Sequence, residues 1–128
     1  MAKWTPFPHA GDYQFDAASV KKQWARLHGG DAEPCPKDAA VLEAWALFHN
    51  GAFEKAAAAG LAAGGAGLTA ANKATCIYAN YLEPKESKRI DLFMAAALRA
   101  EAQQADNPDN INAWYLQAYA LGRYSQGI

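Results

Sequence analysis

The sequence predicts an all-α protein with about six helices. Alanine supplies 31 of the 128 residues, whereas valine and isoleucine together supply six, and this balance favours helices over strands. Apolar residues recur at helical spacing in several segments, and glycine or proline ends most of these segments. A net charge of -1 and fifteen aromatic residues argue for a folded chain with a packed core.

The N-terminal part predicts an extended arm followed by one helix. Residues 4–15 hold two prolines among four aromatic side chains, which suits an extended segment that lays a ring on a neighbouring surface. We expect Trp4 or Phe7 to anchor this arm. Asp16 is a suitable N-cap for a helix that ends near His28, before two glycines. Three apolar residues fall on one side of this helix: Val20, Trp24 and Leu27.

Residues 31–37 cannot continue that helix, because they contain Pro34 and Pro36. We interpret them as a linker. The chain is therefore expected to comprise an N-terminal arm and capping helix (1–37) and a helical region (38–128), which together form a single compact domain.

The next segment predicts an antiparallel pair of helices. Asp38 can cap a helix that runs to the break at Asn50 and Gly51, and a short alanine-rich helix follows over residues 53–63. Two glycines end the second helix at residues 64–65. The tight connection favours helices that pack side by side.

Three further helices are expected in the C-terminal half. Thr69 can cap the first of them, which should stop before Pro84, and a long second helix covers roughly residues 85–105. Residues 106–109 form a strong turn signal. Asn110 or Asn112 then caps the last helix.

Residues 40–63 resemble a tetratricopeptide (TPR) repeat. Small or aromatic residues stand where such a repeat needs close helix crossings and a turn: Ala44, Leu47, Gly51, Phe53, Ala56 and Ala63. Residues 113–121 are similar to the start of another repeat, although the middle unit departs from a constant period of about 34 residues. The resemblance implies antiparallel helix pairs stacked as a short TPR-like α-solenoid, with this chain as an N-terminal fragment of a longer array. A different α-solenoid or an all-α bundle remains an alternative.

The resemblance also implies a binding groove, because the first helices of such repeats line a concave face that holds a peptide. Carrying the register over gives these candidates for a peptide-binding groove: Trp45, His49, Asn72, Cys76, Asn80, Tyr115, Tyr119 and Arg123. The asparagines could hydrogen-bond a peptide backbone, and Arg123 could meet a carboxylate. The alternative for Trp45 is a place in the core, since it shares an apolar stripe with Val41.

Several other functions find little support in the sequence. Twelve basic and thirteen acidic residues, with no long basic run, do not make a nucleic-acid surface. The histidines are widely spaced and are expected at the surface or at helix ends, and no metal or catalytic motif is present. We therefore predict no enzyme activity, cofactor or metal. The absence of a signal-peptide pattern, of a membrane span and of a cysteine framework favours a cytoplasmic protein with reduced thiols.

The predicted function is that of a non-enzymatic scaffold that binds a peptide or protein segment on a concave helix face. Two alternatives are a structural or regulatory domain of a longer protein, and a helical bundle that binds a small molecule. The last helix lacks a partner in the repeat pattern, so its apolar side is expected to be covered by another copy or to stay exposed.

Overall fold

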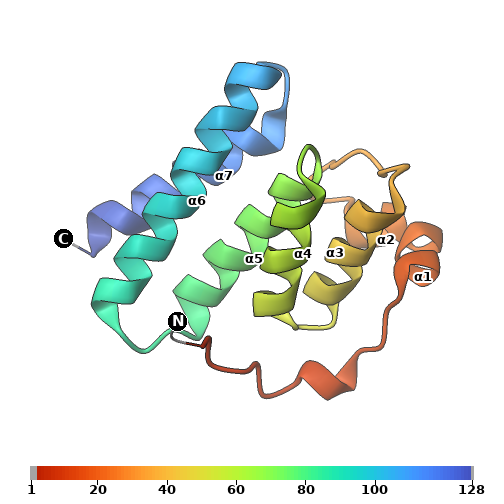
Figure 1. The fold of residues 1–128 in the computed structure, drawn as a ribbon, viewed down its shortest axis with the longest axis horizontal. Coiled ribbons are helices and arrows are strands. Elements are labelled where there is room, and N and C mark those ends of the chain that lie inside the picture. Colours follow the sequence, from red (N-terminus) through yellow and green to blue (C-terminus); the bar gives the residue numbers. More distant parts are fainter. Residues whose placement is uncertain (1–2, 128) are drawn as a thin grey trace.

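The computed structural model describes residues 3–127, which form seven α-helices and one short 3-10 turn, with no β-strand among them (Figure 1). The all-α fold class is therefore confirmed. The elements in chain order are η1 (Ala10–Asp12), α1 (Ala17–Lys22), α2 (Trp24–Leu27), α3 (Ala39–His49), α4 (Phe53–Ala63), α5 (Gly67–Tyr81), α6 (Glu86–Asp106) and α7 (Ile111–Gln126).

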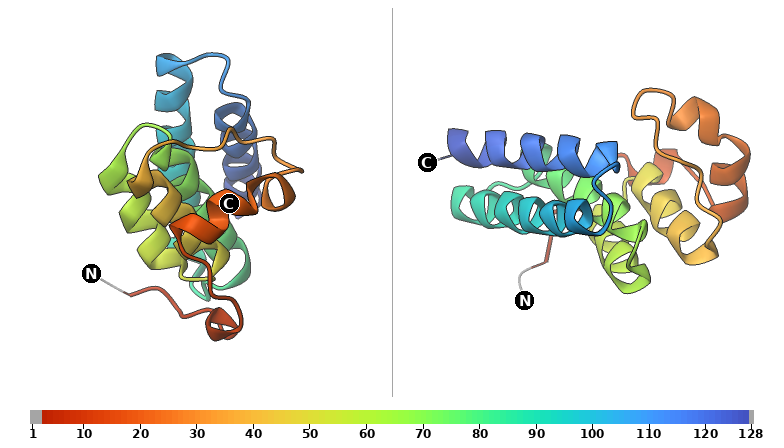
Figure 2. Two further views of the ribbon diagram at one scale, coloured as in Figure 1. Left: turned by 90° about the vertical axis from the view of Figure 1, so that its right-hand side faces the viewer. Right: turned by 90° about the horizontal axis from the view of Figure 1, so that it is seen from above.

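Each helix from α3 to α7 packs against the next one in the chain. In addition, α3 contacts α5 and α5 contacts α7, while α1 packs on α3. Figure 2 shows the long helices α6 and α7 side by side, with α1 and α2 at the opposite end of the molecule. The helix order thus follows the chain order, as the short connections require.

Three of the predicted N-caps are confirmed. The side chains of Asp16, Asp38 and Asn110 each accept a hydrogen bond from a backbone N–H in the first turn of α1, α3 and α7. The predicted first helix is interrupted at Gln23, which has a non-helical backbone, so that α1 and α2 are separate. The expected cap at Thr69 was wrong, because α5 already begins at Gly67 and Thr69 is buried inside it.

Close contact between α4 and α5 depends on two glycines. A Cβ atom added to Gly60 would lie 2.4 Å from the carbonyl oxygen of Gly67, and one added to Gly67 would lie 2.7 Å from the carbonyl oxygen of Gly60. Only residues without a side chain allow the two backbones to approach this closely. Gly67 therefore serves as a contact residue at the start of α5.

The core is built largely from alanine, with a few large side chains between the helices. Val20, Trp24 and Trp45 belong to a cluster that joins the N-terminal helices to α3. Phe93 and Ala97 of α6 pack with Cys76 of α5 in a second cluster. Alanine keeps the helices close together, and a few aromatic rings fill the larger spaces between them.

The N-terminal arm lies along the ends of the helices, as Figure 1 shows. The Trp4 ring stacks on Tyr78 with 4.4 Å between the centroids, and the backbone N–H of Thr5 donates to the Tyr78 hydroxyl at 2.8 Å. The Phe7 ring packs against Phe53 at a tilt of 55°, with a centroid distance of 5.7 Å. Both predicted anchors therefore contact the helical body.

No helix formed by residues 3–127 combines the length and the apolar character that a membrane crossing requires.

Candidate binding face

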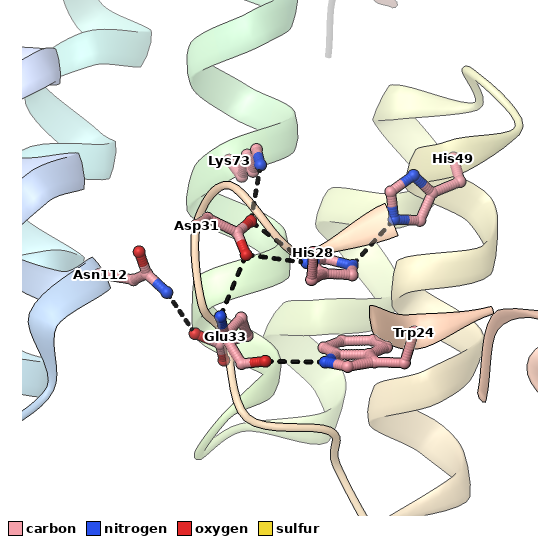
Figure 3. A network of polar contacts seen from close by, with 7 residues as sticks. All are labelled: Trp24, His28, Asp31, Glu33, His49, Lys73 and Asn112. Atoms are coloured by element: carbon pink, nitrogen blue, oxygen red, sulfur yellow. Dashed lines mark hydrogen bonds and ion pairs between the residues drawn. The ribbon is translucent and has the colours of Figure 1, made fainter. Parts of the chain in front are cut away.

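A network of polar contacts joins the N-terminal segment to the faces of α3, α5 and α7 (Figure 3). It begins at α2 and continues through residues 29–33, which we call the strap. The side chains in the network are those of Trp24, His28, Asp31, Glu33, His49, Lys73 and Asn112.

The strap is tied to α5 and α7 by its two carboxylates. Lys73 of α5 donates to Asp31 at 2.9 Å, and the Asn112 amide of α7 donates to Glu33 at 2.7 Å. The Trp24 indole N–H donates to the backbone carbonyl oxygen of Glu33 at 2.7 Å. Ala32 adopts a positive φ of 53°, a strained conformation for a residue with a side chain, which these bonds hold in place.

The pKa values of the two carboxylates are shifted in opposite directions. Burial tends to raise the pKa of Asp31, but the hydrogen bonds from Lys73 and from the backbone N–H of Glu33, together with the charge of Lys73, outweigh burial and leave this pKa below its usual value. Burial raises the pKa of Glu33, and the amide of Asn112 opposes the rise only in part. Asp31 is therefore the ionised anchor of the strap.

Two histidines meet beside the strap. His28 is only 2% exposed and stacks on Trp24 with a centroid distance of 3.8 Å. Its Nε2 lies 2.9 Å from Nε2 of His49, so that one ring donates and the other accepts. His28 lies at the C-terminal end of α2, one of the two places expected for the histidines, but it is buried there by stacking on Trp24 and by contacts with His49 and Asp31.

Burial lowers the pKa of His28, and burial together with the nearby charge of His28 lowers the pKa of His49 to about 4. The unfolded chain then binds more protons than the native protein below the ordinary histidine pKa of about 6.5. We therefore expect the free energy of unfolding to fall as the pH drops from about 6.5 towards about 4, by up to about 3 kcal/mol for His49. Urea denaturation at about pH 7.5 and about pH 4.5 measures this change.

The matched variant for this prediction is His49→Gln, whose side chain does not titrate but can still hydrogen-bond to His28. Its stability should change less over the same pH range. An equal loss of stability in the variant and the wild type would show that another group is responsible.

The contacts of the network hold the strap against α3, α5 and α7. None of its seven side chains carries a hydroxyl or a thiol that the histidines could activate. Within residues 3–127, no group of three or more histidine, cysteine or acidic side chains is arranged to hold a metal ion.

Three of the predicted groove residues lie in the interior. Trp45 and Asn72 have no exposed surface and Cys76 has 1%, so none of them lies on an open face. For Trp45 this is the core position given above as the alternative, whereas Asn72 and Cys76 were expected in the groove. Asn72 is satisfied internally, since it donates to Gln103 and accepts from Arg99. Burial raises the pKa of the Cys76 thiol to about 12. A fourth predicted residue, His49, is half-buried and belongs to the network already described.

The remaining predicted residues come together on α5 and α7. Tyr115 is 59% exposed, and its ring centroid lies 6.3 Å from that of Tyr119. The Arg123 guanidinium lies 5.6 Å from the centroid of the Tyr119 ring. Arg123 also lines a pocket of about 230 Å³ together with Asn80 and Arg89.

A second pocket lies at the strap end of the same two helices. It has a volume of about 470 Å³, and its lining includes Asp31, Lys73, Asn112 and Tyr115. We define the α5/α7 face as the residues that connect the two pockets: Lys73, Asn80, Tyr115, Tyr119 and Arg123.

Sequence reasoning missed Lys73 and Arg89. Lys73 precedes Asn80 by two helical turns and therefore lies on the same side of α5, so the spacing carried a usable signal. Arg89 lies on a different helix, α6, and only the packing of α6 against α5 and α7 brings it to the pocket.

Comparisons with protein-family models, curated proteins and solved structures found no match. We therefore base the function on the geometry of the α5/α7 face.

Proposed function

We propose that this protein is a non-enzymatic, TPR-like scaffold that binds an extended segment of another protein on the α5/α7 face. One observation carries the proposal: each of the two pockets has lining residues from both α5 and α7, the first also from α6, and the second is bordered by the exposed Tyr115. Concave surfaces with aromatic side chains and a few convergent polar groups are typical binding sites. We place this activity in the cytoplasm, where the free thiols Cys35 and Cys76 would stay reduced.

The helix contacts support a repeat arrangement. In this interpretation α3 with α4 forms one unit, α5 with α6 forms the next, and α7 begins a third. The first helices of the units contact one another, from α3 to α5 and from α5 to α7, whereas α4 and α6 make no contact within residues 3–127. Stacked helix pairs produce this pattern, because each unit touches only its neighbours.

The charges on the α5/α7 face favour an acidic residue in the ligand. The pocket of Arg123 is lined by two arginines, Arg89 and Arg123, and one carboxylate, Glu86, so positive charge is in excess there. Arg123 is exposed, and Arg89 donates to the backbone carbonyl oxygen of Glu83 at 2.8 Å. Arginine binds carboxylates with two parallel hydrogen bonds, and Asn80 can pair with a peptide group beside them. At the other end of the face, Lys73 is already paired with Asp31, so the acidic residue of the ligand is expected at the Arg123 end.

Selection of ligands from a random peptide library tests the proposal. We expect the wild-type protein to enrich peptides with an acidic residue, and we expect Asn80→Ala/Arg123→Ala to bind them about 10-fold to 100-fold more weakly, as the loss of charge-assisted hydrogen bonds implies. The control is Lys22→Ala, which removes an exposed charge from α1. Equal affinity of the double variant and the wild type would exclude the α5/α7 face, as would a library in which no peptide is enriched.

A further inference from the structure

Helix α7 has an exposed apolar side in addition to the side that it packs against the body. The exposed positions recur at helical spacing, and we call them the outer stripe: Ile111, Trp114, Tyr115, Ala118, Leu121, Gly122 and Ser125. The four large members are 75% (Ile111), 52% (Trp114), 59% (Tyr115) and 39% (Leu121) exposed. None of the seven carries a charge. Exposed patches of this kind mark interaction surfaces.

The outer stripe is narrow, and its residues are distributed symmetrically about Ala118. With about 100° of rotation per residue, its members fall within an arc of roughly 120° around Ala118. Four residues face the body instead: Asn112, Ala113, Leu116 and Ala120. The stripe extends equally far from Ala118 towards both ends of the helix.

We propose that a second copy of this chain covers the outer stripe, with the two α7 helices antiparallel and a twofold axis at Ala118. In this register Trp114 lies opposite Gly122 of the second copy, and Tyr115 lies opposite Leu121. The pairing is complementary in size, since a large ring meets a residue without a side chain. An added Cβ on Gly122 has no atom within 4 Å, so space for the ring exists there. A twofold interface must be self-complementary in this way.

Charge and preorganisation favour the same arrangement. Arg123 is the sole charged residue of α7, and Asp109 stands exposed just before its first turn. An antiparallel pair brings Arg123 of one helix towards Asp109 before the other helix, so that opposite charges face each other. It also places the positive end of each helix dipole beside the negative end of the other. The Trp114 indole N–H donates to the Pro108 carbonyl oxygen at 2.8 Å, which holds the ring in place and lowers the entropy cost of burying it.

The exposed area indicates a weak dimer. The four large side chains expose on the order of 400 Å² per copy, so the pair buries roughly 800 Å² before polar neighbours are included. Stable interfaces usually bury at least about 1,200 Å². We therefore expect dissociation in the micromolar range, which sedimentation of the wild-type protein at increasing concentration measures.

Two substitutions test the register. Gly122→Trp fills the space meant for Trp114 of the second copy without touching the body, and it should weaken dimerisation at least 10-fold while the helical circular dichroism stays unchanged. Ala118→Cys, made in a Cys35→Ser background, places two thiols at the axis and should form a disulfide between copies under mild oxidation. The control Ala58→Cys exposes a thiol on α4 in the same background.

Different results would contradict the dimer itself and the α7 interface. A wild-type protein that stays monomeric far above micromolar concentration would overturn the proposal. A dimer that Gly122→Trp leaves intact, or in which Ala118→Cys links no faster than Ala58→Cys, would overturn the α7 interface. Tyr115 belongs to both the outer stripe and the α5/α7 face, so the second copy and a peptide compete for its ring. Ala118 and Gly122 lie outside the α5/α7 face, so their substitutions change the dimer without removing a peptide-binding residue.

Discussion

Replacing Gly60 by valine is expected to lower the free energy of unfolding by about 3 kcal/mol or more. Even the Cβ of the new side chain would lie 2.4 Å from the carbonyl oxygen of Gly67 and 2.9 Å from the backbone nitrogen of Ala71. These are backbone atoms of α5, so they cannot rotate away as a flexible side chain could. The two helices must separate, and the alanine contacts between them are lost.

Gly122→Val provides the matched control, because Gly122 lies within α7 with open space around it. The same chemical change there should alter stability by less than about 0.5 kcal/mol. Urea denaturation at low protein concentration measures both variants. A Gly60 variant as stable as the Gly122 variant would mean that α4 and α5 are not in close contact.

Trp45→Ala is expected to cost about 3–5 kcal/mol, the usual range for removing a fully buried tryptophan. Trp45 of α3 has no exposed surface and packs through Trp24 against the capping segment, which comprises α1, α2 and the strap. Its ring centroid lies 5.9 Å from that of Trp24 and 4.6 Å from that of His28. The loss should therefore also loosen α2 and the strap, which hydrogen exchange of residues 24–33 would report.

Trp45→Phe separates packing from hydrogen bonding at the same position. The Trp45 indole N–H is buried without a hydrogen-bond partner among the described residues. Phenylalanine removes this unpaired donor, which offsets part of the lost packing, so we expect a cost below about 2 kcal/mol. If both variants unfolded at the wild-type urea concentration, Trp45 would not hold the capping segment.

The elements that sequence reasoning predicted depend on local signals. Asp16, Asp38 and Asn110 cap helices because each side chain bonds to a backbone N–H at most three residues away. The anchors Trp4 and Phe7 were also predictable, since a proline-rich arm with aromatic residues has few other ways to bury them. The break between α1 and α2 at Gln23 has no comparable signal in the sequence.

The strap depends on long-range partners, which a local pattern does not reveal. Glu33 meets Asn112 across 79 residues, and Asp31 meets Lys73 across 42. Asn72 shows the same difficulty within one helix. It lies on the same side of α5 as Asn80, yet Gln103 and Arg99 bury it, whereas Asn80 lines an open pocket.

The peptide-binding face is the central claim, and nuclear magnetic resonance tests it most directly. A ¹⁵N-labelled sample is titrated with the best peptide from the library selection, and amide shifts are followed for each residue. If the peptide binds on the α5/α7 face, the amide signals of Asn80, Tyr115 and Arg123 should shift during the same titration. The amide signals of the strap should shift with them. Shifts confined to α4 and to the outer side of α6, with these three signals unchanged, would contradict it.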